Sequence, residues 1–132
     1  MFTLKDLLMG RIKESQLTDE LRLNASKLLE AVNNLFKDSG FTLLKLSSGY
    51  RSAAINASVG GAKRSLHMTC RALDIADPHG AIENWVNTQQ DNLAALGLWQ
   101  EHPDSTPGWV HLDIGVRAAK ARPGCLLRQF KP

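Results

Sequence analysis

Two segments that alternate like β-strands each carry a polar residue on a face that is otherwise apolar or small. Strict alternation over 109–114 predicts a strand with His111 on its polar face. Residues 71–76 predict a second strand, in which Asp74 lies between small residues. A buried polar group costs free energy unless it has a partner. His67 lies just upstream, at the end of a Gly-rich loop, so these three side chains are candidates for a shared site.

Two imidazoles and one carboxylate form a ligand set that suits Zn²⁺ and leaves a fourth position for water. Bound zinc lowers the pKa of such a water to near 7 and polarises a carbonyl, which is the chemistry of hydrolysis. Asp113 follows His111 by two residues on the same strand face. It is therefore expected to orient an imidazole through the nitrogen that does not bind metal.

The spacing alone also permits a site without a metal, because His-x6-Asp is less diagnostic than His-Glu-x-x-His. In that alternative His67 is exposed, and Asp74 forms a salt bridge with an arginine. His111 is then a core histidine with ordinary hydrogen-bond partners. On spacing alone both interpretations stay open.

The elements that must position these residues follow a simple order. Predicted helices span residues 3–9, 19–37, 53–58 and 81–96, and predicted strands span residues 41–47, 71–76 and 109–114. Thr3 and Thr18 are suited to cap the first two helices. Helices first, then short strands with one helix between them, predict an α+β domain with a small antiparallel sheet and helices packed on one side.

Length and composition are those of an ordinary globular domain. The 132 residues, of which 43% are hydrophobic, fit a single domain over 1–132. The sequence has no apolar run of about 18 residues, so no stable membrane insertion is expected. Its first residues lack the charged and apolar regions of a signal peptide. Synthesis in the cytoplasm without a signal peptide is the expectation.

The net charge of +3 favours an anionic partner. No long Lys/Arg block interleaved with aromatic residues occurs, so nucleic-acid binding is not indicated. Several basic residues near the C-terminus are expected to form a solvated surface. They are Arg117, Lys120, Arg122, Arg128 and Lys131.

Cys70 and Cys125 are the two cysteines of the chain, and their spacing is not that of a zinc or redox pair. Two reduced, partly buried thiols are expected.

Several ordered motifs resemble a known enzyme family. These are Ser48-Gly49-Tyr50-Arg51-Ser52, Asn56, Val59-Gly60-Gly61-Ala62, Ser65-Leu66-His67-Met68, Ala72-Leu73-Asp74-Ile75 and Trp109-Val110-His111-Leu112-Asp113. Together they resemble the zinc D-alanyl-D-alanine carboxypeptidases, which belong to the LAS metallopeptidases. The opening Phe2-Thr3-Leu4-Lys5-Asp6-Leu7-Leu8 is similar to the small single-domain branch found in phage and bacterial genomes. The resemblance implies a hedgehog and DD-peptidase-like fold.

The resemblance also implies roles for individual residues. His67, Asp74 and His111 match the ligands of Zn²⁺. Arg51 matches a position that faces the carboxylate or carbonyl oxygen of the substrate, which agrees with the fixed donors of a guanidinium. The alternative for Arg51 is a brace of its loop, bonded to backbone carbonyls.

Two departures from the family pattern concern Cys70 and the general base. The family usually has Gly at the position of Cys70, whose thiol would fill space, crowd the site or add a soft ligand. Many relatives carry a Glu three residues before the last zinc-binding His, where this chain has Gly108. Others carry a His two residues before it, where this chain has Trp109.

The preceding loop offers three other candidates for the general base. His102 and Asp104 rank equally and Glu101 follows. The alternative is that the base is missing or is supplied by Asp113.

The function implied is a zinc-dependent peptidoglycan peptidase, either a DD-carboxypeptidase or an endopeptidase. We expect a monomer that acts on wall peptide at the cell wall or in the periplasm, with delivery by a phage as one route. The alternative function is a catalytically degenerate wall-binding module or phage structural module that keeps the fold.

Overall fold

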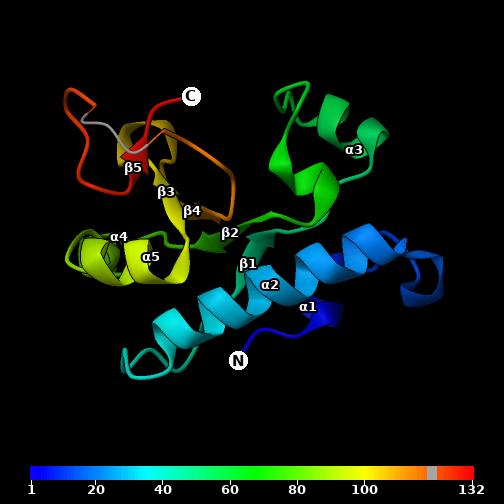
Figure 1. Ribbon diagram of the computed structural model, residues 1–132, viewed down its shortest axis with the longest axis horizontal. Coiled ribbons are helices and arrows are strands. Elements are labelled where there is room, and N and C mark those ends of the chain that lie inside the picture. The colour runs from blue at the N-terminus through cyan, green and yellow to red at the C-terminus, as the bar shows by residue number, and fades with distance from the viewer. Residues whose placement is uncertain (119–121) are drawn as a thin grey trace.

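The computed structural model describes residues 1–118 and 122–132 (Figure 1). Its helices are α1 (Leu4–Leu8), α2 (Asp19–Phe36), α3 (Ala53–Ser58), α4 (Ala81–Asn87) and α5 (Gln90–Leu96). Three short 3-10 helices are η1 (Glu14–Gln16), η2 (Leu66–Thr69) and η3 (Pro103–Ser105). Its strands are β1 (Leu46–Ser48), β2 (Ala72–Ala76), β3 (Trp99–Glu101), β4 (Trp109–Asp113) and β5 (Gln129–Phe130).

The strands form one sheet in the order β1-β2-β4-β3-β5. The pairs β1–β2, β2–β4 and β3–β4 are antiparallel, whereas β3–β5 is parallel. The predicted α+β fold is therefore confirmed, with a mixed sheet in place of a purely antiparallel one. The difference arises because the C-terminal residues return beside β3 in the same direction.

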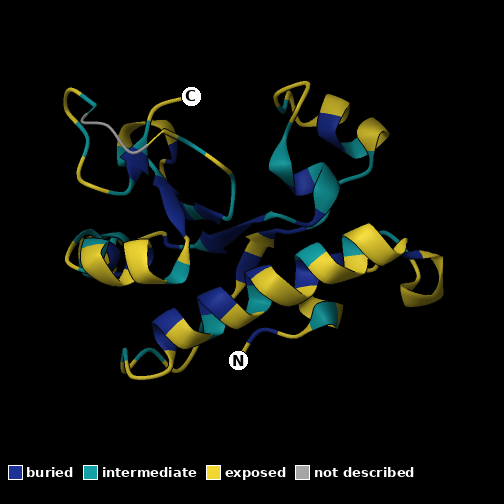
Figure 2. Ribbon diagram, viewed as in Figure 1, coloured by how far each residue is buried: buried dark blue, intermediate teal, exposed yellow. Residues whose placement is uncertain are grey.

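The apolar face of the sheet supports the core. Leu73 and Ile75 of β2 and Val110 and Leu112 of β4 are buried there. Helices α1, α2, α4 and α5 contribute the rest of this core, as the predicted one-sided packing requires. Figure 2 shows the buried stripe of α2 turned toward the sheet and its exposed residues turned outward. Helix α3 lies away from this core, across the sheet from α2 (Figure 1).

The two predicted N-terminal helices are confirmed with their caps. Thr3 accepts a hydrogen bond from the backbone of Asp6, and Thr18 accepts one from the backbone of Leu21. The longest helix, α2, is amphipathic. Among residues 1–118 and 122–132, no helix combines the length and the apolar character needed to cross a membrane.

The predicted helix 81–96 is wrong in its middle, where the chain forms two helices. The backbone amide and the hydroxyl of Thr88 both bond to the carbonyl of Trp85, at 3.0 and 2.6 Å. Side-chain oxygens that compete for backbone groups weaken a helix interior. The break lets Gln90 bond to Gln100 in β3 and to the backbone of Arg128, which ties α5 to β3 and to the residue before β5.

The strand predicted over 41–47 begins only at Leu46. Pairing starts where the amide of Ala76 donates to the carbonyl of Lys45 at 2.8 Å. Strand β2 ends at Ala76, because Asp77 then caps α4 through the amides of Ile82 and Glu83. Residues before Lys45 therefore have no partner strand.

Strands β3 and β5 were not predicted, since each is too short to show alternation. Buried Gln129 anchors β5, because its side-chain amide donates to Asn87 Oδ1 at 3.0 Å and to Gln100 Oε1 at 3.1 Å. A polar contact between side chains distant in sequence thus fixes the last strand.

Both cysteines are free thiols, as predicted. Cys70 is fully buried in the core, and burial raises the pKa of its thiol to about 11. Its φ of 57° lies in the left-handed region, which explains why Gly suits this position in the family it resembles. Cys70 thus fills space in the core, the first of the roles considered for it.

Gly49 allows a close approach between α1 and the loop after β1. The amide of Tyr50 donates to the carbonyl of Leu7 at 2.8 Å, and a Cβ on Gly49 would clash with that same carbonyl. The carbonyl of Gly49 in turn accepts a hydrogen bond from His67 Nδ1 at 2.8 Å. Helix α1 therefore helps to place a candidate ligand.

Gly49→Ala is expected to destabilise the metal-free protein by roughly 2–4 kcal/mol, because the backbone of α1 must move. Urea unfolding followed by circular dichroism measures the loss. Gly60→Ala is the matched control, since its Cβ meets open space and only its φ of 71° adds strain. It should cost about 1 kcal/mol. Equal losses in the two variants would contradict the close approach at Gly49.

Candidate metal centre

One row of side chains crosses the polar face of the sheet. Antiparallel pairing sets Ser48 of β1 opposite Asp74 of β2, and Asp74 opposite His111 of β4. Strand β3 pairs with β4 so that Gln100 lies opposite Leu112, and the next pair in this register is Glu101 and His111. Glu101 is in turn paired with Phe130 of β5. Each strand thus contributes one residue to a row whose middle is His111.

The structure brings the three predicted ligands together. His67, Asp74 and His111 each offer a ligand atom, and these atoms lie within 4.8 Å of one another. Asp74 Oδ1 lies 2.9 Å from His111 Nδ1 and 3.4 Å from His67 Nε2. The alternative with an exposed His67 is wrong, because that residue is only 3% exposed.

The second nitrogen of each imidazole is held by an acceptor away from the cluster. His67 Nδ1 donates to the carbonyl of Gly49, so its Nε2 faces Asp74. His111 Nε2 lies 2.8 Å from Asp113 Oδ2, so its Nδ1 faces Asp74. Outer hydrogen bonds of this kind set the tautomer and ring orientation of metal-binding histidines. Asp113 therefore has the orienting position predicted for it.

Asp113 is itself held in place by the chain that follows β4. Arg117 donates two hydrogen bonds to its carboxylate, at 2.6 and 3.0 Å, and the amide of Gly115 donates a third at 3.0 Å. Burial alone would raise the pKa of Asp113, but the hydrogen bonds from His111 and Arg117 lower it. The carboxylate is thus ionised and aligned toward His111.

In the metal-free cluster, Asp74 and His111 stabilise each other's charged forms. Burial alone would raise the pKa of Asp74, yet hydrogen bonds from His111 and His67 hold that pKa well below its usual range. Burial alone would lower the pKa of His111, yet hydrogen bonds to Asp113 and Asp74 raise it to about 9. A cation between Asp74 and the two imidazoles would replace the proton on His111 Nδ1.

The donor set fits a transition-metal ion. Two nitrogens and one carboxylate oxygen converge from a 3-10 helix and two adjacent strands, and both histidines are pre-oriented. Imidazole and carboxylate donors suit zinc among the common ions. Buried Cys70 is not a member of the cluster, so a soft sulfur ligand is not part of this arrangement.

Arg51 lies at the edge of the cluster and bonds to side chains, not to the backbone carbonyls of its loop. Its guanidinium contacts Asp74 Oδ2 at 3.4 Å, Ser48 Oγ at 3.1 Å and Asn56 Oδ1 at 3.4 Å. Ser52 caps α3 directly after it and so fixes the direction of the loop. Arg51 is thus a cation held beside the three ligands, and it also forms the salt bridge considered for Asp74.

The order predicted for the general-base candidates does not match their geometry. Asp104 has a side chain that is 87% exposed and is paired with His102. His102 uses both ring nitrogens elsewhere: Nε2 donates to the carbonyl of Gly124, and Nδ1 accepts from the amide of Asp104. Neither residue contacts His67, Asp74 or His111, so this geometry gives no support for ranking them above Glu101 as general base.

Glu101 has the position that the other two lack. It lies on β3 in the row that contains His111. Burial raises the pKa of Glu101, and the charges of His111 and Asp74 also act on it. A carboxyl with a raised pKa beside a reaction centre is suited to proton transfer. Sequence reasoning ranked it lower because β3 has only three residues, too few for alternation to place Trp99 and Glu101 on one face.

The metal-free protein is expected to lose stability on both sides of neutral pH. His111 has a folded pKa of about 9, above its ordinary value near 6.5, so its contribution is full below pH 6.5 and is lost as pH rises through 9. Asp74 and Asp113 have lowered pKa values, so their contribution is lost as pH falls below about 4. Urea unfolding should show a decrease of roughly 1–3 kcal/mol between pH 6.5 and 9.5.

His111→Gln should flatten the alkaline part of this profile. His79 is exposed in a turn, so His79→Gln is the matched control and should leave the profile unchanged. An alkaline loss that survives in His111→Gln would show that another group causes it.

A family model described as Peptidase M15 matches residues 1–113, which include the three ligands, Arg51 and Glu101. None of the curated proteins compared with the chain matches it. The match covers most of the chain and agrees with the resemblance to zinc peptidases at the level of the family. Together with the convergence of His67, Asp74 and His111, it shows that the chain belongs to the Peptidase M15 family.

Proposed function

We propose that the protein is a zinc-dependent peptidoglycan peptidase that hydrolyses amide bonds of wall peptides. The observation that carries this proposal is the cluster of His67, Asp74 and His111 in a chain of the Peptidase M15 family. These three residues would hold the ion. Zinc, when bound, supplies an activated water and polarises the carbonyl of the bond to be cut.

Arg51 would bind an oxygen of the substrate. Its guanidinium lies beside Asp74, and its side chain is 15% exposed, so it can exchange a contact inside the site for one with a ligand. A planar guanidinium offers paired donors to a carboxylate and single donors to a carbonyl oxygen. In the transition state the same donors would stabilise negative charge on that oxygen.

Glu101 would serve as the general base. Its carboxylate would accept a proton at Oε1 or Oε2 from the attacking water and deliver that proton to the nitrogen of the leaving amine. Burial, which raises its pKa, favours both the uptake and the release of the proton near neutral pH. His102 and Asp104, which were the first candidates, are directed into contacts with one another and with Gly124.

Asp113 and Arg117 would act by positioning. The bidentate contact from Arg117 fixes the carboxylate of Asp113, which in turn holds His111 Nε2. His111 would then keep Nδ1 turned toward Asp74 and toward the ion that the two residues would hold. Such outer contacts commonly change metal affinity by 10- to 100-fold.

Two finer parts of the proposal concern the bond and the setting. A DD-carboxypeptidase or an endopeptidase is compatible with this constellation, because the two differ in how the far end of the substrate is accommodated. We propose a monomer that acts on the wall or in the periplasm, including after release by a phage. The catalytically degenerate module is less well supported, since Glu101 would supply a base and Cys70 lies in the core, outside the cluster.

His111→Ala should abolish hydrolysis of purified cell walls and lower zinc affinity by at least about 100-fold, because one of three ligands is lost. Release of free amino groups measures hydrolysis, and isothermal titration with zinc measures affinity. His79→Ala is the control, as an exposed histidine outside the cluster. Unchanged wall hydrolysis by metal-stripped His111→Ala protein would refute the proposed function.

Glu101→Gln should keep zinc affinity within about threefold but lower kcat by at least about 100-fold, because the amide cannot accept the proton. Asp104→Asn, which changes an exposed carboxylate in the same way, should keep nearly full activity. The opposite result, with activity lost only in Asp104→Asn, would identify Asp104 and not Glu101 as the general base. A wild-type protein that binds zinc without turnover would support the degenerate wall-binding module.

A further inference from the structure

Three arginines gather around one tryptophan on the β5 side of the sheet. The guanidinium carbons of Arg128, Arg122 and Arg117 lie 3.8, 4.6 and 5.6 Å from the ring centroid of Trp99. Arg117 also lies 3.6 Å from the ring centroid of Phe130. These three arginines are half-buried and stacked, so the predicted solvated surface holds for exposed Lys131 but only in part for them; Lys120 lies outside the described residues. We call Arg117, Arg122 and Arg128 the arginine cluster.

The arginine cluster concentrates positive charge. Arg117 is matched by the carboxylate of Asp113. Burial lowers the pKa of Arg128, the charges of Arg117 and Arg122 lower it further, and the charge of Asp113 acts in the opposite direction. Like charges held this close repel one another unless an anion is shared between them. Stacking on Trp99 offsets part of the repulsion but adds no negative charge.

Arg128 presents hydrogen-bond donors that are ready for such an anion. Its Nε donates to the carbonyl of Leu98 at 2.8 Å, and its guanidinium plane is held against Trp99. Within residues 1–118 and 122–132, neither terminal nitrogen of Arg128 has a hydrogen-bond partner. A guanidinium fixed at Nε and at its face offers its outer edge to a planar oxyanion at low entropic cost.

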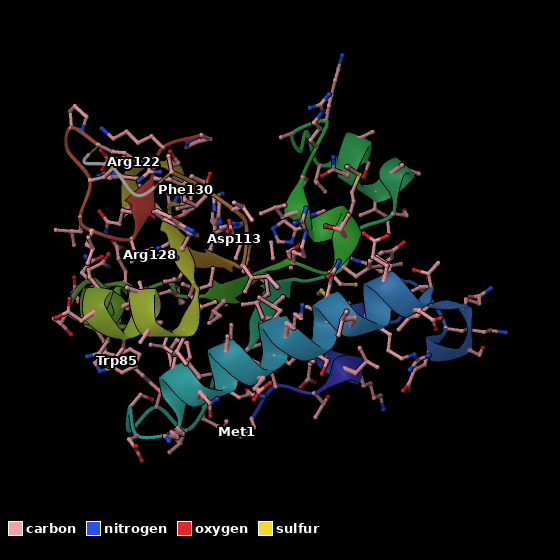
Figure 3. The ribbon with its side chains drawn as sticks, viewed as in Figure 1. Met1, Trp85, Asp113, Arg122, Arg128 and Phe130 are labelled. Atoms are coloured by element: carbon pink, nitrogen blue, oxygen red, sulfur yellow. The ribbon has the colours of Figure 1, made fainter. Side chains whose placement is uncertain are left out.

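The arginine cluster adjoins the candidate metal centre. Phe130 lies between them, with its ring 5.9 Å from that of His111 and directly under the guanidinium of Arg117. Figure 3 shows Arg122, Arg128 and Phe130 around β5, with Asp113 nearer the middle of the sheet. Arg51 approaches the same three ligands from the loop before α3, on the other side of Asp74. The centre thus lies between two cationic positions.

We propose that the arginine cluster is a second substrate subsite, in which Arg128 binds a carboxylate of the wall peptide on the β5 side of the metal centre. The proposal deepens the proposed function and rests on it for the identity of the substrate. The same donors would accept a phosphodiester of an anionic wall polymer, so the experiment must separate the two oxyanions.

The first test uses zinc-free protein and needs no catalysis. Glutarate, as the probe, is titrated into protein labelled with nitrogen-15, and the indole N–H of Trp99 and the Nε–H of Arg128 are followed by NMR. We expect saturable shifts at both groups, and an affinity at least about tenfold weaker in Arg128→Gln. Arg128→Lys, which keeps the charge but not the planar edge, should be intermediate.

Arg22→Gln is the matched control, because Arg22 is an exposed arginine of α2 paired with Glu14. It should bind glutarate like the wild type. Shifts of the wild type that do not saturate, or equal affinity in Arg128→Gln, would overturn the subsite. This arm stands even if no peptidase activity is found, since it involves neither zinc nor turnover.

The second test separates the sources of the oxyanion. Hydrolysis is compared for two soluble wall peptides that differ only in whether one side-chain carboxylate is free or amidated, with and without a soluble phosphodiester polymer as competitor. Arg128→Gln should raise KM for the free acid about tenfold more than KM for the amide. An equal effect on both peptides, or competition by the phosphodiester polymer at lower concentration than by glutarate, would overturn the assignment to a peptide carboxylate.

Discussion

The buried carboxylate of Asp74 is the group around which the functional face is organised. Removing an ionised carboxylate from water costs several kcal/mol unless opposite charges and hydrogen bonds replace the solvent. Here His67, His111 and Arg51 provide that replacement, and they arrive from three different segments of the chain. The loop after β1, the 3-10 helix η2 and strand β4 must therefore all meet at β2. A metal ion that binds there would take over this charge balance from the proton on His111.

Strand pairing in the sheet places the functional side chains in one row. Side chains that are opposite in neighbouring strands lie about 5 Å apart, close enough for hydrogen bonds and shared ions. Because β2 and β4 are central and antiparallel, Asp74 and His111 become direct neighbours although 37 positions separate them. The same pairing brings Glu101 into line from β3 and Phe130 from β5. On the opposite face, Leu73 and Ile75 of β2 and Val110 and Leu112 of β4 support the row with a packed core.

Sequence reasoning identified the candidate ligands from a local pattern together with the family resemblance. Alternation alone places Asp74 and His111 on polar strand faces, and the ordered motifs around them supported the family. It ranked His102 and Asp104 above Glu101 as general base because β3 has only three residues, too few to display a period that would place Glu101 on a strand. His102 and Asp104 were close to His111 in sequence, but the chain reverses between them. The imidazole of His102 bonds to the carbonyl of Gly124 and to the amide of Asp104, and the side chain of Asp104 is exposed.

The sequence by itself determined the α+β class, the caps of α1 and α2, the three candidate ligands and the orienting role of Asp113. Each of these features depends on periodicity or on a contact within a few residues, so residues that are neighbours in the sequence are enough to specify the feature. The tertiary structure alone decided that Glu101 lies in line with His111, that β5 runs parallel to β3 and that Arg128 stacks on Trp99. Those facts depend on strand register and on long-range contacts of Gln129, whose free energy is gained only after the chain has closed its loops.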